Sequence, residues 1–475
     1  MGTRVLQAGG ATADELRSGI EAILQEQGLS PAFPAAVEEV ALRAAGSPQL
    51  AGRDRTELEF LTIDPVGAMD LDQAMHLETE GEGYVVHYAI ADVMAFLEPG
   101  DPVDEEAHRR GESLYGADSK VRLHPKVLSE GAASLLPDEV RPAFVWTIRL
   151  DASGETREAT VERALVRSRQ RLDYAGVQRE IDQAAAGSTL ALLKVVGQLR
   201  MAKEAERGGV SLPMPAQEVE VQDGHWTLEF REMLPVESWN AQISLLAGFA
   251  AASIMLEGKV GILRTLPPAP AQAVTRLRRT ARALGVDWPS GQSYPDFIRS
   301  LDPAKPAEAA MVVACTSLLR GAGYAAFSGS VPEQPQHAAL AATYAHVTAP
   351  LRRLVDRYGL EVCVALCAGR EVPAWVLNRL QDLPDIMRES GRKANAYENA
   401  VLNLVEAETL ESRVGERFDG VITEAEDDER KGTVMLREPA VEAPVSSTSP
   451  LPVGEDVTVT LVVADPATRQ VRFEL

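Results

Sequence analysis

The sequence predicts an α+β multidomain protein in which a short helical module, a large mixed domain and a small β-barrel follow one another. Helical periodicity fills residues 1–56, and alternating strand patterns begin near Leu58. Helices dominate after Leu165, and short alternating strands return in residues 413–475. A chain of 475 residues is long enough for several domains with their own cores.

The N-terminal module, residues 1–56, is expected to hold two short helices. In "TADELRSGIEAILQEQGL", Thr12 is a candidate N-cap with Glu15 three residues later, which is a capping box, and Gly28 ends the helix. The second helix, in "PAFPAAVEEVALRAAG", ends at Gly46. Two arrangements fit equally well, a helix-turn-helix-like module and simple packing against the main domain.

The large central domain is expected to combine strands with helices. The stretches "FLTIDP", "GYVVHYAIADVMAFL" and "AFVWTIRLD" are rich in β-forming residues and are separated by Gly and Pro. Several helical patterns follow, and a long helix is predicted from about Ile386 to about Val414. The sequence shows neither an internal repeat nor the glycine fingerprint of a dinucleotide-binding fold.

Residues 413–475 show short alternating strands with turn signals between them. About five strands in about 60 residues suit a small OB-type barrel. The stretch "STSPLPVG", residues 447–454, is expected to be a loop within it. Phe418 and Phe473 alternate like core positions, and "EAEDDER" adds negative charge.

The net charge of −23 argues against binding of phosphate backbones over the whole surface, although it leaves room for a local basic channel. Three arginine clusters are present, "ERALVRSRQR", "VTRLRRTAR" and "PLRRLVDR", and each taken alone is typical of a solvated helix face. Of the three cysteines, Cys363 and Cys367 lie four apart on one face of a predicted helix and are expected to be buried apolar thiols, not metal ligands. We expect a cytoplasmic protein, because no apolar run approaches the roughly 20 residues that span a bilayer and no signal-peptide core is present.

Three aspartates lie inside the otherwise apolar run "LTIDPVGAMDLDQAMHL". In an extended chain Asp70 and Asp72 point to one side, and a turn through Val66–Gly67 brings Asp64 beside them. Clustered carboxylates repel one another in a low dielectric, and a divalent cation removes that cost. Oxygen-only ligation favours Mg²⁺ or Mn²⁺ over zinc. Taken alone, however, aspartates at this spacing beside Pro and Gly are more typical of turn hydrogen bonds.

Four blocks in order give the aspartates a context: "TIDPVGAMDLDQA", "HYAIADVMAFLEPG", "SLYGADSKVRLHPKVLSEGAASLLPDEVRPAF" and "YAHVTAPLRRLVDRY". Together they resemble the catalytic domain of the RNase II/RNase R family of 3′→5′ exoribonucleases, over roughly residues 57–400. The resemblance implies an RNB-type catalytic domain at residues 57–405. It also makes residues 413–475 similar to the family's C-terminal OB-fold RNA-binding domain.

The resemblance implies a metal site and a catalytic arginine. In the family, the pattern D-x5-D-x-D-D holds two Mg²⁺ ions at the scissile phosphate. Asp64, Asp70 and Asp72 occupy the first three places, and Gln73 occupies the fourth without bringing a charge. We therefore expect these four residues to ligate Mg²⁺, or Mn²⁺, with one ion bound more weakly. Arg352, in "HVTAPLRRLVD", matches the catalytic arginine and is expected to bind the phosphate.

The resemblance also implies residues that bind the substrate. Tyr115 matches an aromatic residue that stacks on a base, and Tyr174 matches a tyrosine linked to substrate selection. His346 and Arg353 share the block of the catalytic arginine and are expected to contact RNA. Leu212, in "GGVSLPMP", stands where the family has a second clamping aromatic, and it can pack on a base without stacking.

Structural roles compete with several of these assignments. An arginine after Pro350 can simply form an ion pair with Asp356, and tyrosines at strand ends often cover a core. The family's ribose-contacting glutamate is replaced here by either Asn240 or Gln242.

The predicted function is Mg²⁺-dependent, hydrolytic 3′→5′ exoribonuclease activity. The chain is expected to act as a monomer without a membrane, to thread single-stranded RNA 3′ ends, and to release nucleoside 5′-monophosphates processively. The alternative is a catalytically weakened RNA-binding or regulatory protein on the same fold, because Gln73 replaces an aspartate. A phosphodiesterase acting on DNA is less favoured.

The ends of the chain carry two further expectations. Family members usually have two cold-shock OB domains before the catalytic domain, whereas about 55 residues with helical patterns precede Leu58 here. We therefore expect a wider channel mouth that lets structured RNA approach more closely. The barrel, with its two core-like aromatics, is expected to bind RNA weakly and to close the channel entrance.

Overall fold

A six-stranded sheet forms the centre of the larger domain, in the order β1-β8-β2-β3-β4-β7. The sheet curls until β7 and β8 also pair with each other. Its strands are β1 (Arg53–Asp54), β2 (Phe60–Asp64), β3 (Gln73–Glu80), β4 (Gly83–Ala91), β7 (Val140–Leu150) and β8 (Thr156–Asp173). The computed structural model describes residues 13–50, 52–116, 120–212, 216–222, 225–231, 233–303, 305–319, 321–426, 429–436, 438 and 441–475.

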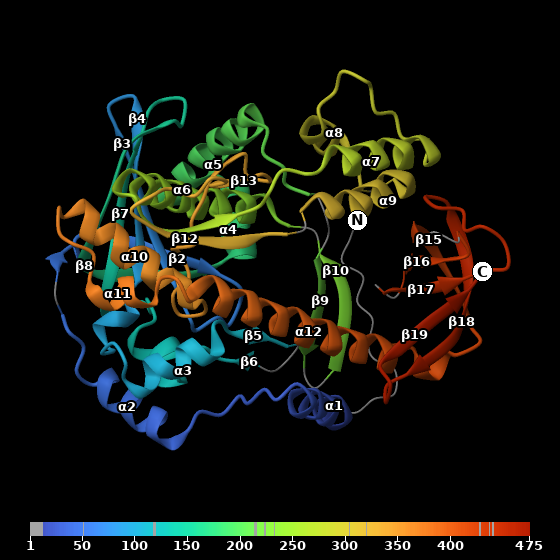
Figure 1. Ribbon diagram of the computed structural model, residues 1–475, viewed down its shortest axis with the longest axis horizontal. Helices are drawn as coiled ribbons and strands as arrows, with labels where there is room; N and C mark the ends of the chain where they lie inside the picture. The colour runs from blue at the N-terminus through green and yellow to red at the C-terminus, as the bar shows by residue number, and fades with distance from the viewer. Residues whose placement is uncertain are drawn as a thin grey trace.

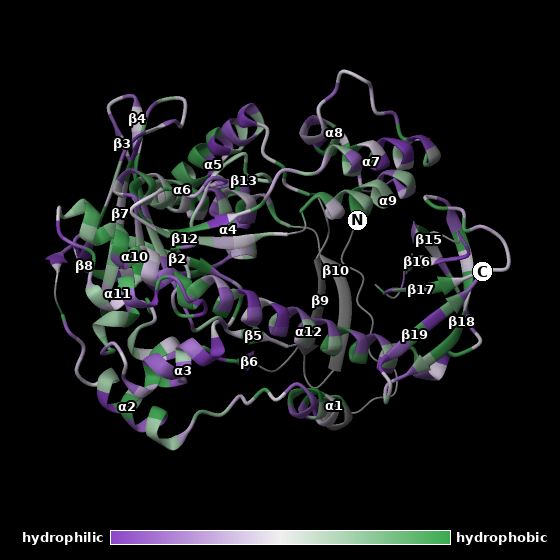
Figure 2. Ribbon diagram, in the orientation of Figure 1, coloured by the Kyte–Doolittle hydropathy of each residue, from purple (hydrophilic) through white to green (hydrophobic). Residues whose placement is uncertain are grey.

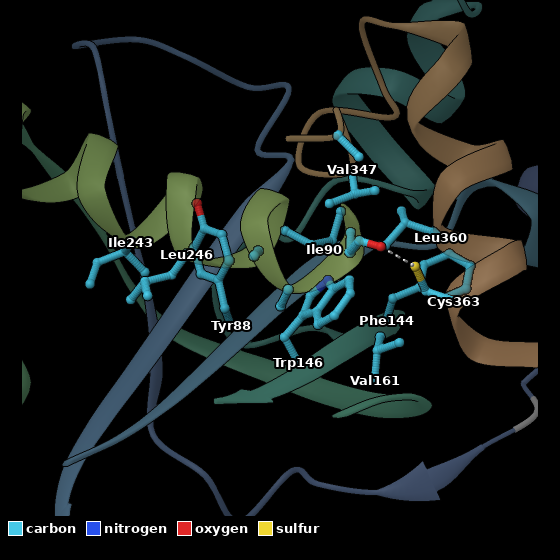
Figure 3. Close-up of a cluster of buried hydrophobic side chains, with 14 of the residues drawn as sticks. Tyr88, Ile90, Phe144, Trp146, Val161, Ile243, Leu246, Val347, Leu360 and Cys363 are labelled. Atoms are coloured by element: carbon cyan, nitrogen blue, oxygen red, sulfur yellow. Dashed lines mark hydrogen bonds between the residues drawn. The ribbon is translucent and has the colours of Figure 1, made fainter. Parts of the chain in front are cut away.

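Both faces of β4 are buried, which explains its nearly continuous apolar run. Tyr88 and Ile90 point into the core shared with helices α6 and α10, and Ala89 and Ala91 point into a second core on the opposite face. Figure 3 shows the first core, where β4, β7 and β8 meet these two helices. The helices on this side are α4 (Tyr174–Asp182), α5 (Ser188–Arg207), α6 (Pro235–Gly258), α10 (Leu354–Cys367) and α11 (Ala374–Arg379).

Helix α6 is long and apolar enough to cross a membrane by length and composition, the only such helix in the described part of the chain. The expectation that no apolar run approaches the length needed to span a bilayer was therefore wrong for this segment. Half of its most apolar window is buried inside the protein, and Ile243 and Leu246 belong to the central core. Its composition is therefore that of a core helix and is weak evidence for a membrane segment.

The two N-terminal helices pack on different parts of the molecule. Helix α1 (Ala13–Glu26) lies along the long helix α12 (Leu383–Leu410), and a Cβ at Gly19 would come within 2.6 Å of Leu404. Helix α2 (Ala35–Ala45) packs instead in the second core, beside α3 (Pro102–Arg110). These contacts favour packing against the main domain over a self-contained module. The Thr12 cap lies outside the described residues.

The C-terminal strands form a closed five-stranded barrel, as the pattern predicted. Phe418 and Phe473 are buried, and their rings meet edge to face with centroids 5.7 Å apart. The amphipathic helix α12 runs from the large domain to this barrel (Figures 1 and 2). The strands are β15 (Arg417–Ala425), β16 (Lys431–Leu436), β17 (Glu442–Ser446), β18 (Asp456–Asp465) and β19 (Gln470–Glu474).

A small helical subdomain interrupts the strand pair β11 (Val260–Thr265) and β12 (Gly323–Ser328). It consists of α7 (Ala271–Ala283), α8 (Tyr294–Ser300) and α9 (Pro306–Cys315) around a core of its own. Short strands elsewhere form the pairs β5 (Leu114–Tyr115) with β6 (Lys120–Val121), β9 (Ala216–Gln222) with β10 (His225–Arg231), and β13 (Gln336–His337) with β14 (Ala342–Thr343).

One arginine cluster lies in a different element from the one expected. The stretch Glu162–Arg171 belongs to strand β8, not to a helix face. Val161, Ala164, Val166 and Ser168 are buried, so the chain alternates with a period of two through most of this segment, and the arginines take the other face. The helix expectation was wrong because the high charge concealed that alternation.

Candidate active site

The three aspartates lie where β2 turns into β3. Asp64 is the last residue of β2, and Asp70 and Asp72 follow in the connection. The turn uses Gly67 at a φ of +83°, a conformation that favours glycine, and the N–H of Ala68 donates to the carbonyl of Pro65 over 3.1 Å. Because β2 and β3 are antiparallel neighbours, the connection holds all three aspartates at one edge of the sheet.

The block around Arg352 closes over Asp72. The backbone N–H of Leu351 donates to Asp72 Oδ1 over 2.8 Å, and Arg352 Nε lies 3.7 Å from Asp72 Oδ2. Asp72 is buried, whereas the Arg352 side chain is 44% exposed. The arginine therefore borders the carboxylate on one side and is open to an incoming anion on the other.

Asp356 positions the loop that carries this arginine. Its Oδ2 accepts the backbone N–H groups of Thr348 (2.9 Å) and Ala349 (2.7 Å), and it also pairs with the guanidinium of Arg353. Asp356 is fully buried, so the loop is held by charge-assisted hydrogen bonds in a low dielectric.

Gln73 joins the two blocks of the site. Its Nε2 donates to the backbone carbonyl of Thr348 over 2.7 Å, and the Tyr88 hydroxyl donates to its Oε1. Both ends of the amide thus have partners inside the protein. The amide oxygen keeps a second lone pair, so ligation through it is compatible with these bonds.

Burial and mutual repulsion make the carboxylates expensive to ionise. Burial, with a contribution from the charge of Asp70, raises the pKa of Asp64 to about 7, and Arg352 opposes the rise. Burial raises the pKa of Asp72 to about 8, again against the pull of Arg352. Carboxylates held in this way lower their energy when a divalent cation joins them.

The donor chemistry fits Mg²⁺, since the site offers carboxylate oxygens without sulfur or imidazole. The side chains are nevertheless not gathered into a ready metal cage. Within the described ranges no three His, Cys, Asp or Glu side chains form a group that could hold an ion. Asp70 is instead turned toward Lys120, with which it forms an ion pair.

Tyr115 stands next to this ion pair. It faces Lys120 across the β5–β6 pair, and the Lys120 ammonium lies 5.0 Å from the centroid of its ring. Burial and the neighbouring charge of Asp70, to which Tyr115 is hydrogen-bonded, raise the pKa of the phenol. The side chain remains 39% exposed, so part of the ring is available to a base.

Tyr174 reaches the site through strand register. Asp64 pairs with Asp173 between β2 and β8, and Tyr174 is the next residue and begins α4. Asn240 Nδ2 donates to the Tyr174 hydroxyl over 3.1 Å, whereas Gln242 points away and donates to Glu204. Of the two amides considered for ribose contact, the geometry brings Asn240 to the site.

Three expected substrate-binding residues have partners inside the protein. Arg353 is paired with Asp356, which is the structural alternative considered from the sequence. His346 Nδ1 lies 2.7 Å from the Tyr324 hydroxyl, and burial holds the pKa of His346 well below its ordinary value. Leu212 packs against the core of the α7–α9 subdomain. Their roles toward RNA stay predictions.

Sequence reasoning missed Lys120 and Tyr88. Lys120 stands in the quoted block "SLYGADSKVRLHP", and the four intervening residues are the length of a hairpin loop that pairs it with Tyr115. That spacing was the available signal. Nothing in the sequence marks Tyr88 as a partner of Gln73, because it is one of many apolar residues in β4.

Comparisons with known families agree with this arrangement. The family model described as the RNB domain matches residues 53–362, and the one described as the RNase II-type exonuclease C-terminal S1 domain matches residues 416–475. The "Probable exosome complex exonuclease RRP44" of Caenorhabditis elegans is 28% identical over 344 residues, which cover 69% of this chain and 36% of that protein. Ribonuclease R of Aquifex aeolicus is 27% identical over 388 residues, covering 78% and 54%. The chain thus spans roughly a third to a half of these relatives.

Solved structures share the fold. Mycoplasma genitalium RNase R in complex with ribose methylated single-stranded RNA superposes with a TM-score of 0.87 at 19% identity, over 97% of this chain and 78% of that one. The structure of the same protein in complex with double-stranded RNA superposes with a TM-score of 0.84 at 19% identity, over 97% of this chain and 83% of that one. Yeast Ssd1, a pseudonuclease, superposes with a TM-score of 0.71 at 14% identity, over 90% of this chain and 55% of that one.

Proposed function

The chain belongs to the RNB family of RNase II-type exoribonucleases, and from this premise we propose that it is itself an active, Mg²⁺-dependent 3′→5′ exoribonuclease. It would hydrolyse RNA processively from single-stranded 3′ ends to nucleoside 5′-monophosphates. The observation that supports this most is the meeting of Asp72 with the Leu351–Arg352 block, 279 residues away in the sequence.

Each residue of the site would have a separate role in the reaction. Asp64 and Asp72, with Asp70 beside them, would form the site for Mg²⁺, which when bound supplies an activated water and offsets charge on the phosphate. Arg352 would bind the non-bridging oxygens of the scissile phosphate, since its guanidinium is partly exposed beside Asp72. Tyr115 would place the terminal base by stacking on the exposed part of its ring.

The direct test uses a single-stranded RNA labelled at its 5′ end, with a DNA of the same sequence as a parallel substrate. With Mg²⁺ we expect the RNA to shorten from its 3′ end and to release nucleoside 5′-monophosphates. EDTA should stop the reaction, and the DNA should remain intact. Cleavage of DNA at the same rate would contradict the assignment to RNA.

A second candidate function has one specific observation in its favour. Gln73 replaces an acidic residue of the family pattern, and a pseudonuclease shares the fold. A purely RNA-binding protein would bind the same RNA with equal affinity as wild type and as Asp72→Asn, and neither would release nucleotides at any Mg²⁺ or Mn²⁺ concentration.

We also propose that paired RNA is reached by threading from a single-stranded 3′ tail. Each step of duplex opening costs about 1–2 kcal/mol, by analogy with stacking in DNA. A GC-rich hairpin with a 3′ tail should therefore slow the enzyme gradually within the stem. Products that all end several nucleotides before the stem, with none shorter, would contradict this.

A further inference from the structure

Lys120 and Asp70 form an ion pair inside the candidate active site. The ammonium contacts Asp70 Oδ2, and the two side chains are only 17% and 18% exposed. Low exposure makes this pair more than a screened surface contact, because water competes little for either charge. No other carboxylate pairs with Lys120 in the described part of the chain.

The ammonium is held from two sides. Lys120 faces Tyr115 in the β5–β6 pair, and its Nζ lies 5.0 Å from the centroid of that ring. The Tyr115 hydroxyl is in turn hydrogen-bonded to Asp70. A cation above an aromatic face gains further stabilisation, so the three side chains form a closed unit that fixes the position of the positive charge.

The other two aspartates have different surroundings. Asp72 accepts the N–H of Leu351 and borders the exposed guanidinium of Arg352, which remains available for a phosphate. Asp64 has no ion-pair partner among the residues that the structure describes. Two carboxylates of the site therefore remain for a metal ion, and the third is already neutralised.

The charge balance of the site depends on residue 73 and on the Lys120 ion pair. The family pattern has four carboxylates, which match two divalent cations. Here Gln73 removes one negative charge and Lys120 compensates another. Three carboxylates and one ammonium leave two negative charges, which is the charge of a single divalent cation.

We propose that Lys120 is a resident cation that takes the place of one of the two metal ions, so that this chain binds one divalent ion, at Asp64 and Asp72. The proposal rests on the exoribonuclease function proposed above and specifies how its metal site is built. Gln73 fits the same scheme, since its amide links Thr348 to Tyr88 and brings no charge that a second ion would need.

The test counts Mn²⁺ ions bound per full-length chain, by electron paramagnetic resonance of the free ion after EDTA treatment and dialysis. Wild type should bind one Mn²⁺. Lys120→Met removes the charge, nearly preserves the length of the side chain, and should bind two ions. Lys120→Arg keeps the charge and should bind one. Lys126→Met is the matched control, because Lys126 is 74% exposed and pairs with Glu130, and it should bind one ion like wild type.

Two Mn²⁺ ions in wild type would overturn the proposal, since the lysine would then leave Asp70 whenever metal binds. An unchanged count of one in folded Lys120→Met would also overturn it. If Lys120→Met does not fold, Lys120→Gln provides the decision, because it also removes the charge: two bound ions support the proposal and one bound ion overturns it. Because ion counting needs no RNA, an inactive protein with the expected counts would refute the proposed function alone.

Discussion

The aspartate site and the C-terminal barrel are stabilised in opposite ways. The large domain buries many ionisable side chains, among them Asp72, Asp92, Asp104, Asp356 and Arg357. In the described part of the barrel, the only fully buried polar residue is Thr423, and the core is built from residues such as Phe418 and Phe473. The large domain thus carries the electrostatic cost of burying ionisable groups, whereas the described barrel core is built from apolar side chains apart from Thr423.

The largest effect is expected from Asp72→Asn, which removes a charge from the site while its Oδ1 can still accept the Leu351 N–H. Hydrolysis should fall by on the order of 10²–10³-fold or more, the range for loss of one electrostatic stabiliser. RNA affinity should stay nearly unchanged in a filter-binding assay. Asp419→Asn, an exposed change on the barrel, is the control and should keep full activity. A wild-type rate in Asp72→Asn would exclude Asp72 from the metal site.

A core substitution in the barrel should lower stability and leave the rate of hydrolysis nearly unchanged. Phe473→Ala leaves a cavity beside Phe418 and should lower the free energy of unfolding of the barrel by about 3–5 kcal/mol. Denaturant unfolding followed by circular dichroism measures this loss. At a temperature where the variant is folded, the rate of nucleotide release from a short RNA should change little. A loss of hydrolysis as large as that of Asp72→Asn would break the division between the two regions.

The pH dependence of stability should distinguish the regions further. Asp72 has a pKa near 3.8 when unfolded and about 8 in the folded, metal-free protein. Between these values the folded state keeps a proton that the unfolded state has lost, so stability declines as pH rises from about 4 to 8.

In EDTA, Asp72→Asn should therefore melt close to wild type near pH 4 and at a higher temperature near pH 8. Differential scanning calorimetry measures both proteins. At pH 8 the free energy of unfolding of the variant should exceed that of wild type by about 2–5 kcal/mol. Mg²⁺ should raise the melting temperature of wild type more than that of the variant. A difference between the two proteins that shrinks as pH rises would contradict the assignment.

A smaller effect is expected at Gln73. Gln73→Asp adds a carboxylate and should lower the Mg²⁺ concentration needed for half-maximal activity, by roughly tenfold if the new charge reaches the metal. The same change loses the donor to Thr348 and should destabilise the protein by about 1–3 kcal/mol. Gln73→Asn introduces a side chain of the same shape as aspartate but without its charge. Comparing the two variants therefore isolates the effect of the charge. Equal Mg²⁺ titrations of the two variants would place residue 73 outside the metal shell.

Much of the architecture could be predicted because it depends on local periodicity. The barrel follows from five alternating segments, and α12 follows from helical spacing near the predicted limits. The aspartate triplet and Arg352 were also predicted, since the four blocks occur in a fixed order. The stretch Glu162–Arg171 was misassigned to a helix because its dense charge hid a period of two.

The sequence by itself determined the order of the elements and the chemical types present at the site. Only the tertiary structure decided which distant partner each polar side chain has: Gln73 bonds to Thr348, 275 residues away, and Lys120 neutralises Asp70. The physical reason is that secondary structure follows from the spacing of neighbours along the chain. A hydrogen bond or ion pair in a buried site depends instead on which distant segments packing brings within about 3 Å.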